Sequence, residues 1–142
     1  RLDAMQAAVL KVKLKYLDEY NLARLAVADA YDLAFSVSDK IKTPFRSEFS
    51  SHAFHQYTVK LADRVDRDGL NAFLEERGIP SMIYYPVPNH LQKAYQFYGY
   101  QEGDFPLTED LCSRVISFPI HTEMETEQQQ LIIDTVLEYL GR

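Results

Sequence analysis

The 142-residue chain has 15 basic and 21 acidic residues, a net charge of −6 and a hydrophobic content of 46%. These values are typical of a single globular domain that can bury a core. The acidic balance argues against a nucleic-acid-binding protein, and no apolar run reaches the ~20 residues of a membrane-spanning helix. We therefore expect neither a nucleic acid nor a membrane as a partner, and the lone Cys112 favours a reducing cytoplasm.

An apolar stripe at spacings of three and four predicts one helix over about residues 2–33. Neither glycine nor proline occurs before Pro44. So long a helix needs more partner surface than the rest of the chain offers, and we expect its first half to pack on a missing domain or another subunit. A self-contained helical hairpin is the alternative. Because the chain enters this pattern directly at Arg1, we also expect it to be a piece of a longer protein.

Three later segments are predicted to be strands. Residues 52–61 alternate with a period of two, which is typical of a half-buried strand. Residues 81–85 and residues 115–118 are the other two predicted strands. Residues 36–51 contain many small polar residues and are predicted to be an irregular connection.

Two helices are predicted between these strands. Asp66 or Asp68 can cap the first of them, and Gly78 ends it just before Pro80. The second is a short helix over residues 90–97, which ends near Gly99. Both are bounded by residues that favour turns.

Two more helices complete the predicted fold. Pro106 suits a first helical turn, and the helix that it opens is expected to turn three side chains inward, Leu107, Leu111 and Val115. Thr126-Glu127-Gln128-Gln129 has the spacing of a capping box that starts a last helix. The order of elements predicts an α+β fold, with a long linking helix over residues 1–35 and a small two-layer domain over residues 36–142. About three strands in that domain are covered by helices.

The segment around Pro86 and Pro88 is the most informative loop. Each proline lacks a backbone donor and disfavours helix in the preceding residue, so this stretch cannot belong to one helix or one strand. Rigid loops after strands often carry ligand-contacting groups. His90 is therefore expected either to contact a substrate or to pack at a helix N-terminus, and the residues favour neither. His121 is expected to anchor a turn.

Neither a metal site nor an activated nucleophile is predicted. His52 and His55 are three apart on a predicted strand and so face opposite ways, which is poor geometry for one metal ion. Ser113 and Ser117 have no Gly-x-Ser-x-Gly elbow around them, and Cys112 is expected to belong to the core. The five glycines are isolated and form no phosphate-binding loop.

Several motifs, in the same order along the chain, resemble those of the DegT/StrS-type sugar aminotransferases. In that family a helix follows an Asn-x-Arg motif, and the start of this chain is similar to that helix. The motifs are Arg1-Leu2-Asp3-Ala4-Met5-Gln6-Ala7-Ala8-Val9-Leu10-Lys11-Val12-Lys13-Leu14, His52-Ala53-Phe54-His55-Gln56-Tyr57, Gly78-Ile79-Pro80, Tyr84-Tyr85-Pro86-Val87-Pro88-Asn89-His90-Leu91-Gln92, Gly103-Asp104-Phe105-Pro106 and Phe118-Pro119-Ile120-His121. The resemblance covers nearly the whole chain. Many relatives have His in place of Tyr84 and Leu in place of Asn89.

The resemblance implies the C-terminal small domain of a homodimeric fold type I enzyme that uses pyridoxal 5'-phosphate. Such enzymes move an amino group from glutamate to a nucleotide-linked keto sugar, in amino-sugar, polysaccharide or antibiotic-sugar biosynthesis. Their Schiff-base lysine and most of the cofactor site lie in a large domain, which would precede Arg1. We therefore expect no catalytic residue here, Arg1 near the cofactor, and Tyr85, His90 and His55 as substrate contacts.

Two alternatives remain open at the level of the sequence. One is a sugar dehydratase or another non-transaminating relative on the same fold, in which a histidine replaces the lysine. The other is a non-catalytic module whose aromatic loop binds a protein partner.

Overall fold

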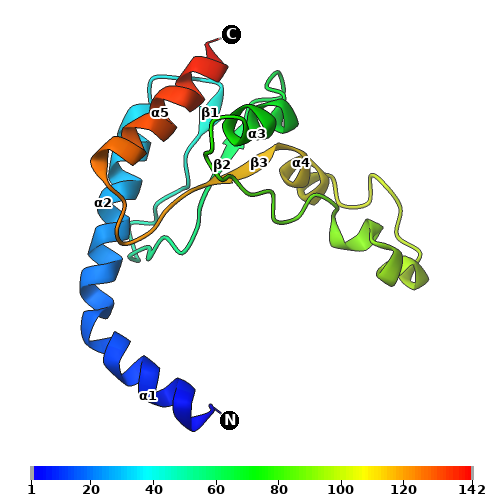
Figure 1. Cartoon of the computed structure of the whole chain (residues 1–142). Coiled ribbons are helices and arrows are strands. Elements are labelled where there is room, and N and C mark those ends of the chain that lie inside the picture. The colour runs from blue at the N-terminus through cyan, green and yellow to red at the C-terminus, as the bar shows by residue number, and fades with distance from the viewer. Residues whose placement is uncertain (1, 142) are drawn as a thin grey trace.

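The computed structural model describes residues 2–141 and has an α+β fold, with a three-stranded antiparallel sheet in the order β1–β2–β3 (Figure 1). The strands are β1 (Ile41–Lys42), β2 (Tyr57–Leu61) and β3 (Val115–Phe118). Tyr57 pairs with Phe118, and Ile41 pairs with Leu61. The predicted fold class and the predicted strand at residues 115–118 are confirmed.

The other two predicted strands are wrong in extent. The strand expected over residues 52–61 begins only at Tyr57, because Phe54 has a φ of 46° and the chain bends just after it. The Nδ1 atom of His52 accepts the N–H of Phe54 at 2.9 Å and stabilises this turn. Residues 36–51, expected to be irregular, contain the short edge strand β1.

Residues 81–85 do not form a strand. Only Met82 pairs with β3, through two backbone hydrogen bonds with Ser117 of 2.9 and 3.0 Å. The prolines at positions 86 and 88 lack the donors that would extend this pairing, so the segment leaves the sheet after one bridge. The third strand of the sheet is therefore β1.

The core lies between one face of the sheet and three helices, α2 (Leu17–Phe35), α3 (Arg67–Glu75) and α5 (Thr126–Leu140). Alternate residues of β2 supply this face, and Tyr57, Val59 and Leu61 are all buried. Helices α2 and α5 lie side by side along it (Figure 1). The opposite face is polar, because Lys60 of β2 points away from the core and pairs with Asp110 of helix α4 (Pro106–Arg114) at 2.6 Å.

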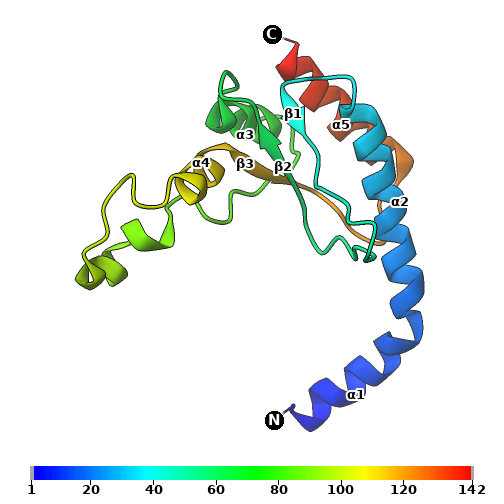
Figure 2. The same ribbon diagram turned by 180° about the vertical axis from the view of Figure 1, so that it is seen from behind.

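The long N-terminal helix is interrupted. Helix α1 (Ala4–Lys13) and α2 are joined by a 3-10 turn at Leu14–Tyr16, where Tyr16 has φ −108° and ψ 7°. The prediction of one unbroken helix is therefore wrong at this turn, and α1 projects away from the sheet in both views (Figures 1 and 2). No residue of α1 is buried. Its apolar side chains Met5, Val9, Leu10 and Val12 are each more than half exposed.

The second half of α2 belongs to the core. Ala28, Tyr31 and Phe35 are fully buried against the sheet. Within α2, the buried residues begin at Val27. The predicted boundary between a linking helix at residues 1–35 and a small domain at residues 36–142 stays a prediction.

The helix ends predicted from capping residues and Pro106 agree with the structure in part. Asp66 caps α3 as expected, because its Oδ1 atom accepts the N–H of Gly69 at 3.0 Å. Helix α4 (Pro106–Arg114) does begin at Pro106, but Leu107 is 70% exposed and not inward, since α4 packs on the polar face of the sheet. The capping box of α5 uses Glu125 with Gln128, one residue before the predicted Thr126.

Two further features concern the connections. The predicted helix at residues 90–97 is a pair of 3-10 helices, Asn89–Leu91 and Lys93–Tyr98, and Gly99 ends the second with a φ of 78°. His121 anchors its turn as predicted, by accepting the N–H of Glu123 on Nδ1. No helix within residues 2–141 is both long enough and apolar enough to cross a membrane.

Removing the cap of α3 gives a first prediction. The Asp66→Ala substitution leaves the N–H of Gly69 without its side-chain acceptor, so we expect it to lower the free energy of unfolding by about 1 kcal/mol. Urea denaturation measures this difference. Asp66→Asn is the matched control, because asparagine caps helices as well as aspartate does. Equal losses in both variants would contradict a capping role.

Candidate functional site

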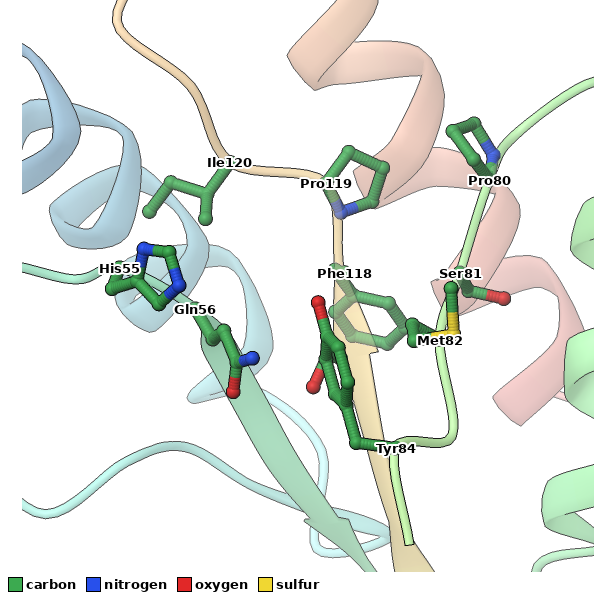
Figure 3. A pocket seen from close by; sticks show the side chains of 10 residues that line it. His55, Gln56, Pro80, Ser81, Met82, Tyr84, Phe118, Pro119 and Ile120 are labelled. Carbon is green, nitrogen blue, oxygen red and sulfur yellow. The ribbon is translucent and has the colours of Figure 1, made fainter. Parts of the chain in front are cut away.

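Two hollows flank the segment that follows Met82. The first hollow has a volume of about 260 Å³ and is lined by His55, Gln56, Pro80, Ser81, Met82, Tyr84, Ser117, Phe118, Pro119 and Ile120. Figure 3 shows His55 and Gln56 on one side of it and Pro80, Ser81 and Met82 on the other, with Tyr84 between. The walls thus come from the bend before β2, from the segment beside β3, and from the end of β3.

The second hollow lies beyond the prolines. It has a volume of about 520 Å³ and is lined by Tyr85, Val87, Pro88, Asn89, His90, Phe105, Thr108, Leu111, Cys112 and Val115. Its walls come from the Pro-x-Pro segment and from α4. Cys112, expected to be in the core, is only partly buried and lines this hollow.

The structure divides the predicted substrate residues between the two hollows. Tyr85 and His90 lie together on the second hollow, and His55 lies on the first. The neighbouring Tyr84 lines the first hollow, so these two consecutive tyrosines lie on different hollows. Arg1 lies outside the described residues. The predicted role of each residue stays a prediction.

His90 is held in place by its surroundings. Its side chain is only 8% exposed, its Nε2 atom lies 3.0 Å from Oε1 of Glu109, and its ring lies 4.8 Å from that of Phe105. The imidazole therefore forms part of the wall of the second hollow.

Glu109 is a residue that the sequence analysis missed. Besides His90, it accepts the backbone N–H groups of Gly103 and Phe105 at 3.0 and 3.2 Å. The N–H of Gly103 is the main cause of a lowered pKa for this carboxyl, and His90 adds to it. Glu109 lies in the first turn of α4, where an acidic residue also suits the helix dipole. This position after Pro106 was the one available sequence signal.

A second polar cluster fixes the backbone next to His55. Arg46 contacts Asp29 at 2.6 Å and Asp32 at 2.5 Å, and its guanidinium lies 4.8 Å from the ring centre of Phe54. The hydroxyl of Tyr57 donates to Asp32 at 2.5 Å. Burial, followed by this bond to Asp32, raises the pKa of Tyr57 well above its usual range. The cluster joins the loop before β2 to helix α2.

Comparison with known proteins assigns the family. The model of the DegT/DnrJ/EryC1/StrS aminotransferase family matches residues 1–137. The chain belongs to this family. The predicted resemblance is thereby confirmed.

Relatives within the DegT family match this chain along nearly its full length. The chain is 40% identical to the pleiotropic regulatory protein of Geobacillus stearothermophilus, over 98% of this chain and 37% of the relative. It is 35% identical to the dTDP-3-amino-3,6-dideoxy-α-D-galactopyranose transaminase of Aneurinibacillus thermoaerophilus, again over 98% of this chain and 37% of the relative. The chain therefore spans little more than a third of the length of these relatives.

A solved structure has the same fold as this chain. The crystal structure of DesV from S. venezuelae, in complex with a ketimine intermediate, superposes with a TM-score of 0.92 at 37% identity. The superposition covers 100% of this chain and 38% of DesV. The α+β architecture of this chain is thus that of part of DesV.

The two hollows described above supply no cationic side chain for a cofactor phosphate. Neither hollow is lined by a lysine or an arginine from residues 2–141. Lys40 instead donates to the backbone oxygen of Leu140, and Lys60 pairs with Asp110. Within the same residues, no cluster of three or more His, Cys, Asp or Glu could hold a metal ion.

Proposed function

We propose that this chain is the C-terminal small domain of a pyridoxal phosphate-dependent enzyme that transfers an amino group from glutamate to a nucleotide-linked keto sugar. The observation that carries this proposal is the family match over residues 1–137. The relative named as a dTDP-sugar transaminase and the ketimine complex of DesV support it. Residues 1–35 would then link a large domain to the small domain at residues 36–142.

The proposed substrate contacts are Tyr85 and His90 on the second hollow and His55 on the first. Tyr85 is 67% exposed, so its ring and hydroxyl are free to meet a ligand. Tyrosine offers a flat apolar face together with a polar tip, and imidazole nitrogens bond hydroxyl groups. These groups suit the hydroxylated sugar and the base of a nucleotide sugar. Arg1 is proposed to lie near the cofactor, on the strength of its motif.

The cofactor is proposed to be held by residues outside this chain, since neither hollow here supplies a cation for it. When bound, pyridoxal phosphate provides the electron sink through which an amino group changes carbon. The residues described here bind and orient the sugar. A cytoplasmic homodimer is proposed for the full-length protein, and the uncovered apolar stripe of α1 supports a partner surface there.

Assay of the full-length protein tests the proposal. With pyridoxal phosphate and glutamate, we expect a nucleotide keto sugar to gain nitrogen and glutamate to become 2-oxoglutarate, both followed by mass spectrometry. A panel of dTDP- and UDP-linked keto sugars that yields no glutamate-dependent product would contradict the proposal. A product that loses water without gaining nitrogen would favour the dehydratase alternative.

Tyr85→Phe tests the substrate role of the loop. Removal of the hydroxyl is expected to raise the KM for the nucleotide sugar by about tenfold, the effect of losing one hydrogen bond to a bound ligand. Tyr95→Phe is the matched control, because Tyr95 lies on the same loop and lines neither hollow. Equal KM values for the two variants would contradict the assignment of Tyr85.

A further inference from the structure

We propose that Glu109 is a positioning residue, whose carboxylate fixes the imidazole of His90 and the backbone at Gly103 and Phe105 and so shapes the second hollow. The proposal rests on the proposed function, because it assigns this hollow to the nucleotide sugar. It gives Glu109 no contact with the substrate. The residue acts through the groups that it holds.

Four short contacts converge on this one carboxylate. Oε1 of Glu109 lies 3.0 Å from Nε2 of His90, 3.0 Å from the nitrogen of Gly103 and 3.2 Å from the nitrogen of Phe105. Oε2 lies 3.0 Å from the same nitrogen of Gly103. His90 lies before the loop of residues 93–105, and Gly103 and Phe105 lie at its end. A single side chain of α4 therefore contacts the chain on both sides of this loop.

The loop between Lys93 and Phe105 buries little surface. Every residue from 93 to 105 is exposed, and the segment projects beyond α4 in both views (Figures 1 and 2). Apolar burial therefore contributes little to its position. Gly103 has a φ of 93°, a conformation that other residues rarely adopt, and here its N–H meets the carboxylate. Polar contacts to Glu109 therefore connect the loop to α4, together with the ring of Phe105, which lies 4.8 Å from that of His90 and 5.0 Å from that of Tyr100.

An ionised carboxylate suits this set of partners. All three groups around it donate hydrogen bonds, and the carboxylate is an acceptor through both oxygens. The N–H groups of Gly103 and Phe105 and the neighbouring His90 lower the pKa of Glu109, which favours its charged form. In a glutamine that keeps its oxygen at the Oε1 position, the NH₂ group takes the place of Oε2. This group would face the N–H of Gly103, so a donor would face a donor.

The contact also sets the chemistry of His90. In a neutral imidazole, donation from Nε2 to Glu109 leaves Nδ1 without a proton, as an acceptor. A hydroxyl group of a sugar is a matching donor. Loss of the Glu109 contact leaves the imidazole ring free to rotate and to exchange tautomers. It also removes the hydrogen bond that holds the backbone of Phe105 in the wall of the second hollow.

The test compares Glu109→Gln with Glu102→Gln in the full-length protein. Both substitutions remove one negative charge from the same region, and no hydrogen bond or ion pair of Glu102 is found within residues 2–141. In Glu109→Gln we expect hydrogen exchange at the amides of Gly103 and Phe105 to accelerate by about tenfold, as for loss of a charge-assisted hydrogen bond. The amides of β2 serve as an internal reference and are expected to be unchanged.

Kinetics provide the second readout. We expect the KM for the nucleotide sugar to rise by about tenfold in Glu109→Gln, with kcat at saturating sugar changed by less than about twofold, because the loss falls on substrate positioning. An unchanged exchange rate at Gly103 and Phe105, or an unchanged KM alongside faster exchange, would overturn the proposal. If the wild-type protein aminates no sugar, the proposed function fails, and the exchange measurement still decides whether Glu109 holds the wall.

Discussion

The Phe35→Ala substitution is expected to lower the free energy of unfolding by about 3–5 kcal/mol, the range for removing a large aromatic side chain from a core. Phe35 is fully buried at the end of α2. Its ring lies 5.7 Å from that of Tyr31 and 5.6 Å from that of Phe118, so the substitution opens a cavity between the helix and β3. Urea denaturation of the chain measures the loss.

Leu33→Ala is the matched control for this prediction. Leu33 lies two residues earlier in the same helix and is 76% exposed, so its truncation is expected to change the free energy of unfolding by less than about 0.5 kcal/mol. A small effect of Phe35→Ala, or a large effect of Leu33→Ala, would contradict the placement of the second half of α2 in the core.

The Asp32→Ala substitution is expected to cost about 2–3 kcal/mol. It leaves the buried hydroxyl of Tyr57 without its acceptor and removes one of the two carboxylates around Arg46. Because Arg46 and Asp32 are partly exposed, water compensates part of the loss of the ion pair. Most of the expected loss of stability therefore comes from the hydroxyl of Tyr57, which keeps no hydrogen-bond acceptor.

A double-mutant cycle isolates that hydroxyl. In the Tyr57→Phe background the hydroxyl is absent, so Asp32→Ala is expected to cost about 1–2 kcal/mol less than it does in the wild-type chain. Urea denaturation of the four proteins measures the coupling. Strictly additive losses would show that the bond between Tyr57 and Asp32 contributes nothing to stability.

The elements that the sequence predicts well are those whose ends are set by local chemistry. Asp66 caps α3 through its own side chain, and Pro106 fixes the start of α4. The strand at residues 115–118 is a short apolar run that needs no distant partner to be recognised. In each case the deciding interaction lies within a few residues along the chain.

The elements that the sequence predicts badly depend on distant contacts. The alternation over residues 52–61 indicates a strand throughout, yet the turn at Phe54 is held by His52 and covered by Arg46. The two-residue strand β1 is defined only by its pairing with β2. The inward face predicted for α4 failed because this helix packs on the polar side of the sheet, which its own sequence does not reveal.

The candidate site divides in the same way. The motifs bring attention to Tyr85, His90 and His55, but only the folded chain separates them into two hollows. Glu109 escaped notice because its role depends on backbone N–H groups, which every residue except proline carries. A pattern of side chains cannot indicate such a contact.

Borohydride reduction of the full-length protein with bound pyridoxal phosphate, followed by peptide mapping, tests the central claim most directly. We expect one stoichiometrically labelled lysine, located outside residues 1–142, since none of the lysines described here lines either hollow. Stoichiometric labelling of a lysine within residues 1–142 would contradict the claim that this chain supplies only the substrate-side wall. The absence of any labelled lysine would contradict the aminotransferase assignment itself.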